Sequence, residues 1–377
     1  MSNRNLAFLV ILTAAVVVLT AFLHVEGKKD APPAVAGTYL IQGLDPDSIS
    51  KITIEGKDDA VNLVRRGDGF VVAEKKDYPA SNKVINELII KSLDIRVDQK
   101  ITENVENHAD LGVAEDSEDA VSVTFIGADD KPLVGYIKSK SDEESGGFYL
   151  RPVGNDTVYR SGNYLWLQTR PIDYVDREIL SVTKSDIEQV DIAVGEEKYT
   201  IAKDESDKVS LGSIPEGKKV KDSEHENVFH ALSSLRISDV LPADELDLEW
   251  DGKYVCRLKS GLIYTVSSAE KDGKTYVRLS AQAPKPGRIE IGKEDSDEEL
   301  KEKEAMILAA ETAAEIGETH GEWIYEIPSS AAKKLRKPFA ELIEDIEPEA
   351  EDDETAEEGE PEAADDMRPK AAEEATP

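Results

Sequence analysis

The chain has 377 residues, 40% of them hydrophobic, which is enough for two or three domains with cores of ordinary size. Its 79 acidic and 45 basic residues give a formal net charge of −34, so most of its surface would repel nucleic acid or an anionic lipid surface. The composition therefore excludes a chain that is disordered throughout and argues against nucleic-acid binding.

The first predicted element is a transmembrane helix over residues 6–23, preceded by a cytoplasmic head over residues 1–5. The 18 residues of this segment carry no charge, and as a helix they span about 27 Å, close to the roughly 30 Å of a hydrocarbon core. A cleaved signal peptide is the alternative, but a small-x-small site would then follow at once, and the sequence continues instead with His24-Val25-Glu26-Gly27. We therefore expect an uncleaved anchor, a linker over residues 24–43, and the long part of the chain outside the cytoplasm.

A first α+β unit is predicted over residues 44–180. Short alternating runs such as "KITIEG", "VNLVRRG" and "GFVVAE" predict antiparallel strands. The period then changes, and residues 81–95 predict an amphipathic helix with Ser81 as N-cap and Ile85, Leu88, Ile89 and Leu93 on one face. Further strand patterns follow, including "NYLWLQ", and "RPIDYVDREIL" closes the unit as a short helix.

A second unit over residues 181–345 repeats this order. Residues 185–203 overlay residues 47–65 without a gap, placing Ile52 over Val190 and Ile54 over Ile192, and residues 225–237 supply the matching helix. An insert over about 284–320 predicts another helix with a Ser296–Glu299 capping box and Gly317 as its stop. The repeat of about 140 residues indicates tandem, mainly antiparallel-sheet units, each with one main packed helix.

The chain ends in an acidic segment over residues 346–377. Residues 347–377 hold 14 acidic and 2 basic side chains and no aromatic residue. Such a composition cannot bury enough apolar surface to offset its ordering entropy, so we expect this tail to be disordered.

A search for chemistry finds no catalytic constellation, metal site or cofactor motif. His225 and His230 lie five positions apart, about 140° around a helix, which does not suit one metal ion. Residues 212–219 have the glycine and lysine spacing of a phosphate loop but lack the following Ser or Thr, so a turn explains them better. Cys256 alternates in phase with Tyr254 and Leu258 and is expected to be a buried strand thiol.

One detail recurs in both units and is a candidate contact surface for a partner protein. Tyr149 and Arg151 in the first unit correspond to Tyr276 and Arg278 in the second. Residues i and i+2 of a strand share a face, so each unit would present a ring beside a guanidinium, a combination enriched in interfaces. The alternative is an arginine that lies over a neighbouring carboxylate. Trp166 and Trp323 fall in matching strands and are expected in the core.

The stretches "FYLRPVGNDTVYRSGNYLW" and "RPIDYVDREILSVTKSDIEQVDI" resemble the bacterial domain of unknown function 4340 family, and the resemblance extends over about residues 44–344. It implies a single-pass protein of the bacterial inner membrane with a periplasmic body, and an auxiliary role in ABC-type transport systems of the gliding-motility type. It supplies no catalytic residues.

We therefore expect a non-enzymatic accessory or scaffold protein that binds another envelope or membrane protein. Two alternatives remain open, a hydrolase of envelope glycans and a module that binds a small ligand. Both would use a cleft between the two units.

Overall fold

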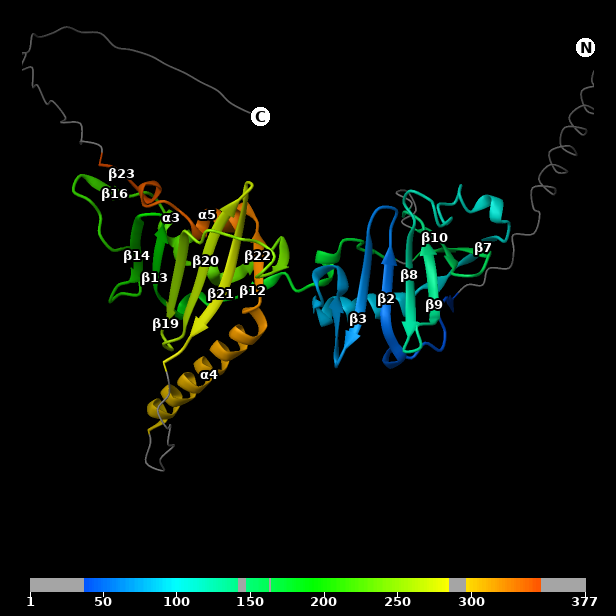
Figure 1. Cartoon of the computed structure of the whole chain (residues 1–377), viewed down its shortest axis with the longest axis horizontal. Helices are drawn as coiled ribbons and strands as arrows, with labels where there is room; N and C mark the ends of the chain where they lie inside the picture. Colours follow the sequence, from blue (N-terminus) through cyan, green and yellow to red (C-terminus); the bar gives the residue numbers. More distant parts are fainter. Residues whose placement is uncertain (1–36, 142–146, 163, 285–295, 347–377) are drawn as a thin grey trace, which may run out of the picture.

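The computed structural model describes residues 37–141, 147–162, 164–284 and 296–346. These residues form a mixed α and β structure in which every strand pairing is antiparallel. Figure 1 shows two large sheets side by side along the long axis of the molecule. The expected α+β class with mainly antiparallel sheets is confirmed.

The first sheet has nine strands among the described residues. In spatial order they are β5 (Tyr78–Pro79), β4 (Gly69–Val72), β3 (Ala60–Arg66), β2 (Ile49–Glu55), β8 (Val121–Gly127), β9 (Pro132–Lys138), β10 (Phe148–Pro152), β11 (Val158–Ser161) and β7 (Gln99–Thr102).

The second sheet has eight strands in the described part of the chain. In spatial order they are β15 (Val209–Leu211), β14 (Glu197–Lys203), β13 (Ile187–Val194), β19 (Gly252–Leu258), β20 (Ile263–Lys271), β21 (Lys274–Gln282), β22 (Trp323–Ile327) and β18 (Asp239–Pro242).

Both sheets follow the same strand order from β4 to β7 and from β15 to β18. The overlaid positions also share one burial pattern, because Ile52 and Val190 are fully buried in β2 and β13, as are Leu63 and Ile201 in β3 and β14. The repeated spacing of apolar residues thus produces the same inward-facing positions in each sheet.

The predicted helix of the first unit forms as α2 (Asn82–Leu93). Ile85, Leu88 and Ile89 are buried as the spacing predicts. Ser81 occupies the N-cap position, although its side chain makes no capping hydrogen bond.

The single helix predicted over residues 225–237 is wrong. The chain forms a short α3 (Glu224–Phe229) and a 3-10 turn, η6 (Ala231–Ser234), with non-helical backbone angles at His230 between them. The Tyr254 hydroxyl lies 2.7 Å from the Val228 carbonyl oxygen and 3.2 Å from the Phe229 carbonyl oxygen. In a continuous α-helix these carbonyls would accept the amides of residues 232 and 233, so the tyrosine replaces the helical partners.

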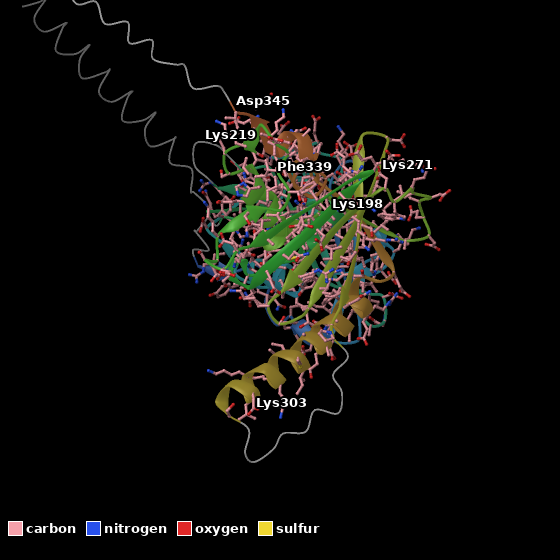
Figure 2. All side chains as sticks on the ribbon, turned by 90° about the vertical axis from the view of Figure 1, so that its left-hand side faces the viewer. Lys198, Lys219, Lys271, Lys303, Phe339 and Asp345 are labelled. Carbon is pink, nitrogen blue, oxygen red and sulfur yellow. The ribbon has the colours of Figure 1, made fainter. Side chains whose placement is uncertain are left out.

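The helix of the insert is α4 (Asp297–His320), and its Ser296–Glu299 capping box is present. Gly317 does not stop it, because a single glycine inside a helix costs only about 1 kcal/mol and the extra turn places His320 Nδ1 2.6 Å from the Tyr325 hydroxyl. Figure 2 shows α4, which carries Lys303, projecting from the body. A last short helix, α5 (Ser329–Leu335), follows β22.

Three two-stranded sheets and six further 3-10 turns complete the described residues. The small sheets pair β1 (Thr38–Tyr39) with β6 (Arg96–Val97), β12 (Glu178–Leu180) with β17 (Leu235–Arg236), and β16 (Lys218–Val220) with β23 (Ile343–Asp345). The other 3-10 turns are η1 (Pro46–Ser48), η2 (Ala73–Lys75), η3 (Val105–Asn107), η4 (Pro171–Tyr174), η5 (Lys184–Asp186) and η7 (Phe339–Leu342).

Several local predictions need correction. The linker predicted over residues 24–43 runs too far, because β1 pairs with β6 and Ile41 is buried. The closing helix predicted over residues 170–180 is the single turn η4 followed by β12, because Pro171 fits the first position of a helix while Glu178 and Leu180 pair with β17. The described part of "NYLWLQ", residues 164–168, forms no strand.

The predicted anchor over residues 6–23 and the tail over residues 347–377 lie outside the described residues. Among the helices that the structure does describe, none is both long enough and apolar enough to cross a bilayer.

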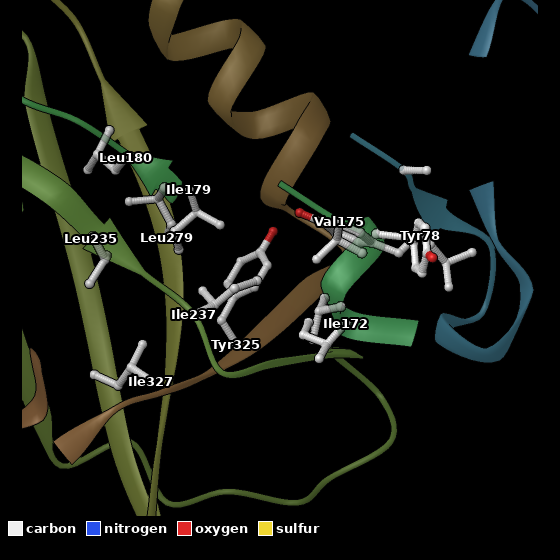
Figure 3. Packing of buried hydrophobic residues seen from close by; sticks show 14 of the residues in the cluster. Tyr78, Ile172, Val175, Ile179, Leu180, Leu235, Ile237, Leu279, Tyr325 and Ile327 are labelled. Atoms are coloured by element: carbon white, nitrogen blue, oxygen red, sulfur yellow. The ribbon is translucent and has the colours of Figure 1, made fainter. Parts of the chain in front are cut away.

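The two units meet in a packed junction rather than through a free linker. Tyr78 of β5 lies edge-to-face against Trp323 at 4.9 Å and against Tyr325 at 6.3 Å between ring centroids. Lys75 and Asp239 form an ion pair beside these rings. Figure 3 shows the buried side chains running from the second sheet through Ile172 and Val175 to Tyr78.

The connecting segment is bound to both units. On the first side, Val175 forms a bridge with Ala80, and the Ser81 amide donates to the Tyr174 carbonyl at 2.8 Å. On the second side, β12 pairs with β17. Most buried apolar side chains of both units consequently belong to one continuous cluster.

Candidate interaction surfaces

In the first unit, Tyr149 and Arg151 lie on β10 beneath residues 103–120, which we call the covering loop. Arg151 is only 7% exposed. Its Nε donates to the Val113 carbonyl at 3.1 Å and its Nη1 to the Asn155 carbonyl at 3.2 Å. The bond to Val113 fixes the loop to the sheet, and the guanidinium is not presented to solvent, while Tyr149 is half-buried beside it.

In the second unit, the corresponding residues on β21 separate in exposure. Tyr276 is 8% exposed and belongs to the core. Arg278 is exposed, and its guanidinium lies 4.7 Å from the centre of the Trp250 ring. A role for these four residues in binding a partner stays a prediction, and only Tyr149 and Arg278 offer surface to one.

Trp166 and Trp323 were both expected in the core, and this prediction is wrong for Trp166. Trp323 packs against Tyr78 in the junction, whereas Trp166 is 63% exposed and Tyr164 is 73% exposed. Leu165 between them is buried. In this extended segment Leu165 therefore faces the core and its two neighbours face solvent. A shift of one residue along an extended segment turns every side chain to the other face, which is why Trp166 was placed in the core by mistake.

A cavity of about 530 Å³ lies beside Tyr149, between the covering loop and residues of β10, β11 and the chain after β9. Its lining includes carboxylates of the loop, among them Asp110 and Asp119, and the basic side chains of Lys140 and Arg160. The neighbouring Lys138 is buried, donates to the Ser139 carbonyl at 2.8 Å, and lies 4.7 Å from the centre of the Phe148 ring. Burial lowers the pKa of this lysine to about 8.

The described residues bring together no group of three or more metal-binding side chains. His225 is buried in α3, and its Nε2 lies 3.3 Å from the Val209 carbonyl oxygen. Cys256 is fully buried, as predicted, and burial raises the pKa of its thiol to about 12. This thiol is therefore protonated and unreactive at neutral pH.

The clefts that a hydrolase or a ligand-binding module would need were expected between the units. Five cavities in the described residues are each lined by side chains of a single unit. The junction itself is occupied by the packed rings of Tyr78, Trp323 and Tyr325.

The outer face of the second sheet is a surface that sequence reasoning missed. Strand register places Lys198, Lys253 and Arg278 in one row across it, on β14, β19 and β21. All three are exposed. The residues are far apart in sequence, so only the pairing of the strands reveals that they form a row.

Comparison with known proteins finds one matching family model. Residues 71–249 match the family model described as Domain of unknown function (DUF4340). The match begins in β4 of the first sheet and ends just before β19 of the second, so it crosses the junction. The resemblance of this chain to the domain of unknown function 4340 family is thus confirmed over residues 71–249. Neither the curated proteins nor the solved structures gave a match.

Proposed function

We propose that the protein is a non-enzymatic accessory or scaffold subunit, anchored in the bacterial inner membrane by residues 6–23, with its body in the periplasm. Its partner would be another envelope or membrane protein, in particular a component of an ABC-type transport system. The observation that supports this proposal is the packed junction, which joins two sheets with the same strand order into a single elongated body.

A body of this kind suits a scaffold for a physical reason. Two units that share a buried cluster and an ion pair hold their outer surfaces at a fixed separation, so a partner that contacts both does not have to order them first. A module that closes around a ligand needs the opposite arrangement, a hinge with an open cleft.

The membrane topology is tested by fusing alkaline phosphatase after Glu344. The phosphatase folds and is active only outside the cytoplasm, where its disulfides form. We expect an active fusion, and a stable but inactive fusion would overturn the proposed orientation.

Partner binding is tested by purifying the tagged full chain from detergent-solubilised membranes and identifying what is retained. We expect a membrane component of a transporter in a stoichiometric amount. Combined Tyr149→Ala and Arg278→Glu substitutions should reduce its recovery at least fivefold, since aromatic and arginine side chains often dominate interfaces. Tyr39→Ala with Arg66→Glu changes the same residue types elsewhere and should leave recovery unchanged. Equal recovery from both variants would remove the predicted contact.

A further inference from the structure

The two sheets differ in what covers their outer face. In the first unit the covering loop connects β7 to β8, and its Val113 and Ala120 pack on Ile137 and Val158 of the sheet. In the second unit the corresponding connection, from β18 to β19, is residues 243–251, half as long as residues 103–120. Trp250 of this connection contacts the row of cations through Arg278. The open part of the outer face of the second sheet therefore lies at Lys198, Lys253 and Arg278, whereas Tyr276 and Ala269 on the same face are buried.

The cations on this open face are regularly spaced and unpaired. Cross-strand pairing connects the three cations through one small residue each. Ala193 of β13 lies between Lys198 and Lys253, and Ser267 of β20 lies between Lys253 and Arg278. Each cation is thus two strands from the next, about 9.6 Å at the usual strand separation. Within the described residues, none of the three has a carboxylate within ion-pair distance.

The acidic group on the face is already engaged. Asp191, in the adjoining row, accepts from Thr200 Oγ1 at 2.8 Å and from Gln189 Nε2 at 2.7 Å, and it pairs with Arg257 at 3.3 Å. Glu196 lies in the turn before β14, Glu197 of β14 accepts the Phe339 amide, and Glu326 of β22 pairs with Lys274 at 2.7 Å. In a chain of net charge −34, the row is a local site of positive potential.

The chain itself holds a segment of matching charge and period. Residues 347–377 carry 14 acidic and 2 basic side chains, and glutamates recur at every third position: Glu351, Glu354, Glu357 and Glu360. In a polyproline II conformation, which unfolded chains adopt readily, residues three apart project to the same side with a repeat of about 9.3 Å. This repeat agrees with the spacing of about 9.6 Å between the cations.

The point of attachment lies close to β14. The Phe339 amide of η7 donates at 3.0 Å to the carboxylate of Glu197, which precedes Lys198 in the strand and so points to the opposite face. The described chain ends seven residues later, at Ile346, whose amide donates to Gly217 at 3.0 Å. Figure 2 shows Lys198, Phe339 and Asp345 in the same half of the second unit, opposite Lys303. From Ile346, the eight residues to Glu354 can span up to about 28 Å.

We propose that the acidic C-terminal segment, residues 347–377, docks on the open face of the second sheet. Three consecutive members of the glutamate series bind Lys198, Lys253 and Arg278 in that order, because the segment enters from the side of β14. Individual exposed ion pairs are weak, but tethering gives the segment an effective concentration on the order of millimolar. Docking covers in the second unit the face that the covering loop closes in the first, and it does not depend on the identity of any partner.

The test is zero-length carbodiimide crosslinking of the purified full chain, with fragmentation of the crosslinked peptides. We expect Lys198 to link to one glutamate of the series and Lys253 to the glutamate three residues further on. Arg278→Lys should add a third link, another three residues on. Raising the salt from about 0.05 M to 0.5 M shortens the screening length from about 14 Å to about 4 Å and should abolish all of these links.

Arg278→Gln provides a readout that does not remove a crosslinked residue. It should lower the yield at Lys198 and Lys253 by about twofold to fivefold, as the loss of one exposed ion pair predicts. Arg66→Gln is the matched control on the first unit and should leave the yield unchanged. Links spread evenly over exposed lysines, links in the reverse order, or links between two molecules would each overturn the proposal.

Discussion

The packed junction makes a sharp prediction for Tyr78→Ala. The ring is 5% exposed and contacts Trp323 and Tyr325 across the junction. Removal of a buried aromatic side chain costs about 3–5 kcal/mol, and each edge-to-face pair accounts for about 0.5–1.5 kcal/mol beyond simple burial. We therefore expect a loss of about 3–5 kcal/mol, concentrated where the units meet.

The assay is urea denaturation followed by far-UV circular dichroism, with calorimetry of the same samples. The wild-type body should unfold in one transition, and Tyr78→Ala in two, because each sheet then unfolds without the support of the other. Tyr164→Ala removes the same side chain from an exposed position and should change the stability by less than about 1 kcal/mol. A single transition with a similarly small loss for Tyr78→Ala would refute the account of the junction.

Three further predictions concern the second unit. Burial lowers the pKa of His320 below its ordinary 6.5, so the unfolded chain binds the proton more readily and stability falls as the pH drops below about 6.5; His320→Gln should flatten the pH dependence of unfolding between pH 7 and 5. Arg336 forms two bonds of 2.8 and 2.9 Å with the Asp251 carboxylate, so Arg336→Met should cost about 2–3 kcal/mol in urea denaturation, whereas Lys334→Met should cost little. Ser296→Ala removes the N-cap of α4 and should lower the protection of its first turn in hydrogen exchange by about 1 kcal/mol, without a change in the global transition.

The strands were the most predictable part of the fold. Alternation of apolar residues over β2 and β13 identifies both the strands and their buried faces, as Ile52, Ile54 and Val190 show. The spacing of Ile85, Leu88 and Ile89 likewise identifies α2. These signals are local, so a single sequence contains them.

The failures arise where a distant residue decides the local structure. Residues 225–237 have a helical pattern, but Tyr254 on β19 takes the carbonyls that would continue α3. Gly317 predicts the end of α4, but the contact between His320 and Tyr325 stabilises the next helical turn. Neither partner can be identified from the spacing within the segment.

The candidate surfaces were less predictable than the fold. Arg151 has the spacing of an exposed strand residue, yet it is buried and bound to the carbonyl groups of Val113 in the covering loop and of Asn155, which carry no sequence signature. The row of Lys198, Lys253 and Arg278 depends on the register of five strands, which periodicity alone does not fix.

The measurement that tests the proposed scaffold function most directly is lysine-reactive crosslinking of the protein in its native membrane, followed by mass spectrometry. We expect a stoichiometric link to a membrane component of an ABC-type transporter, with crosslinked positions close to Tyr149 and Arg278. Only links within the chain, in a sample where established membrane complexes are recovered, would contradict it.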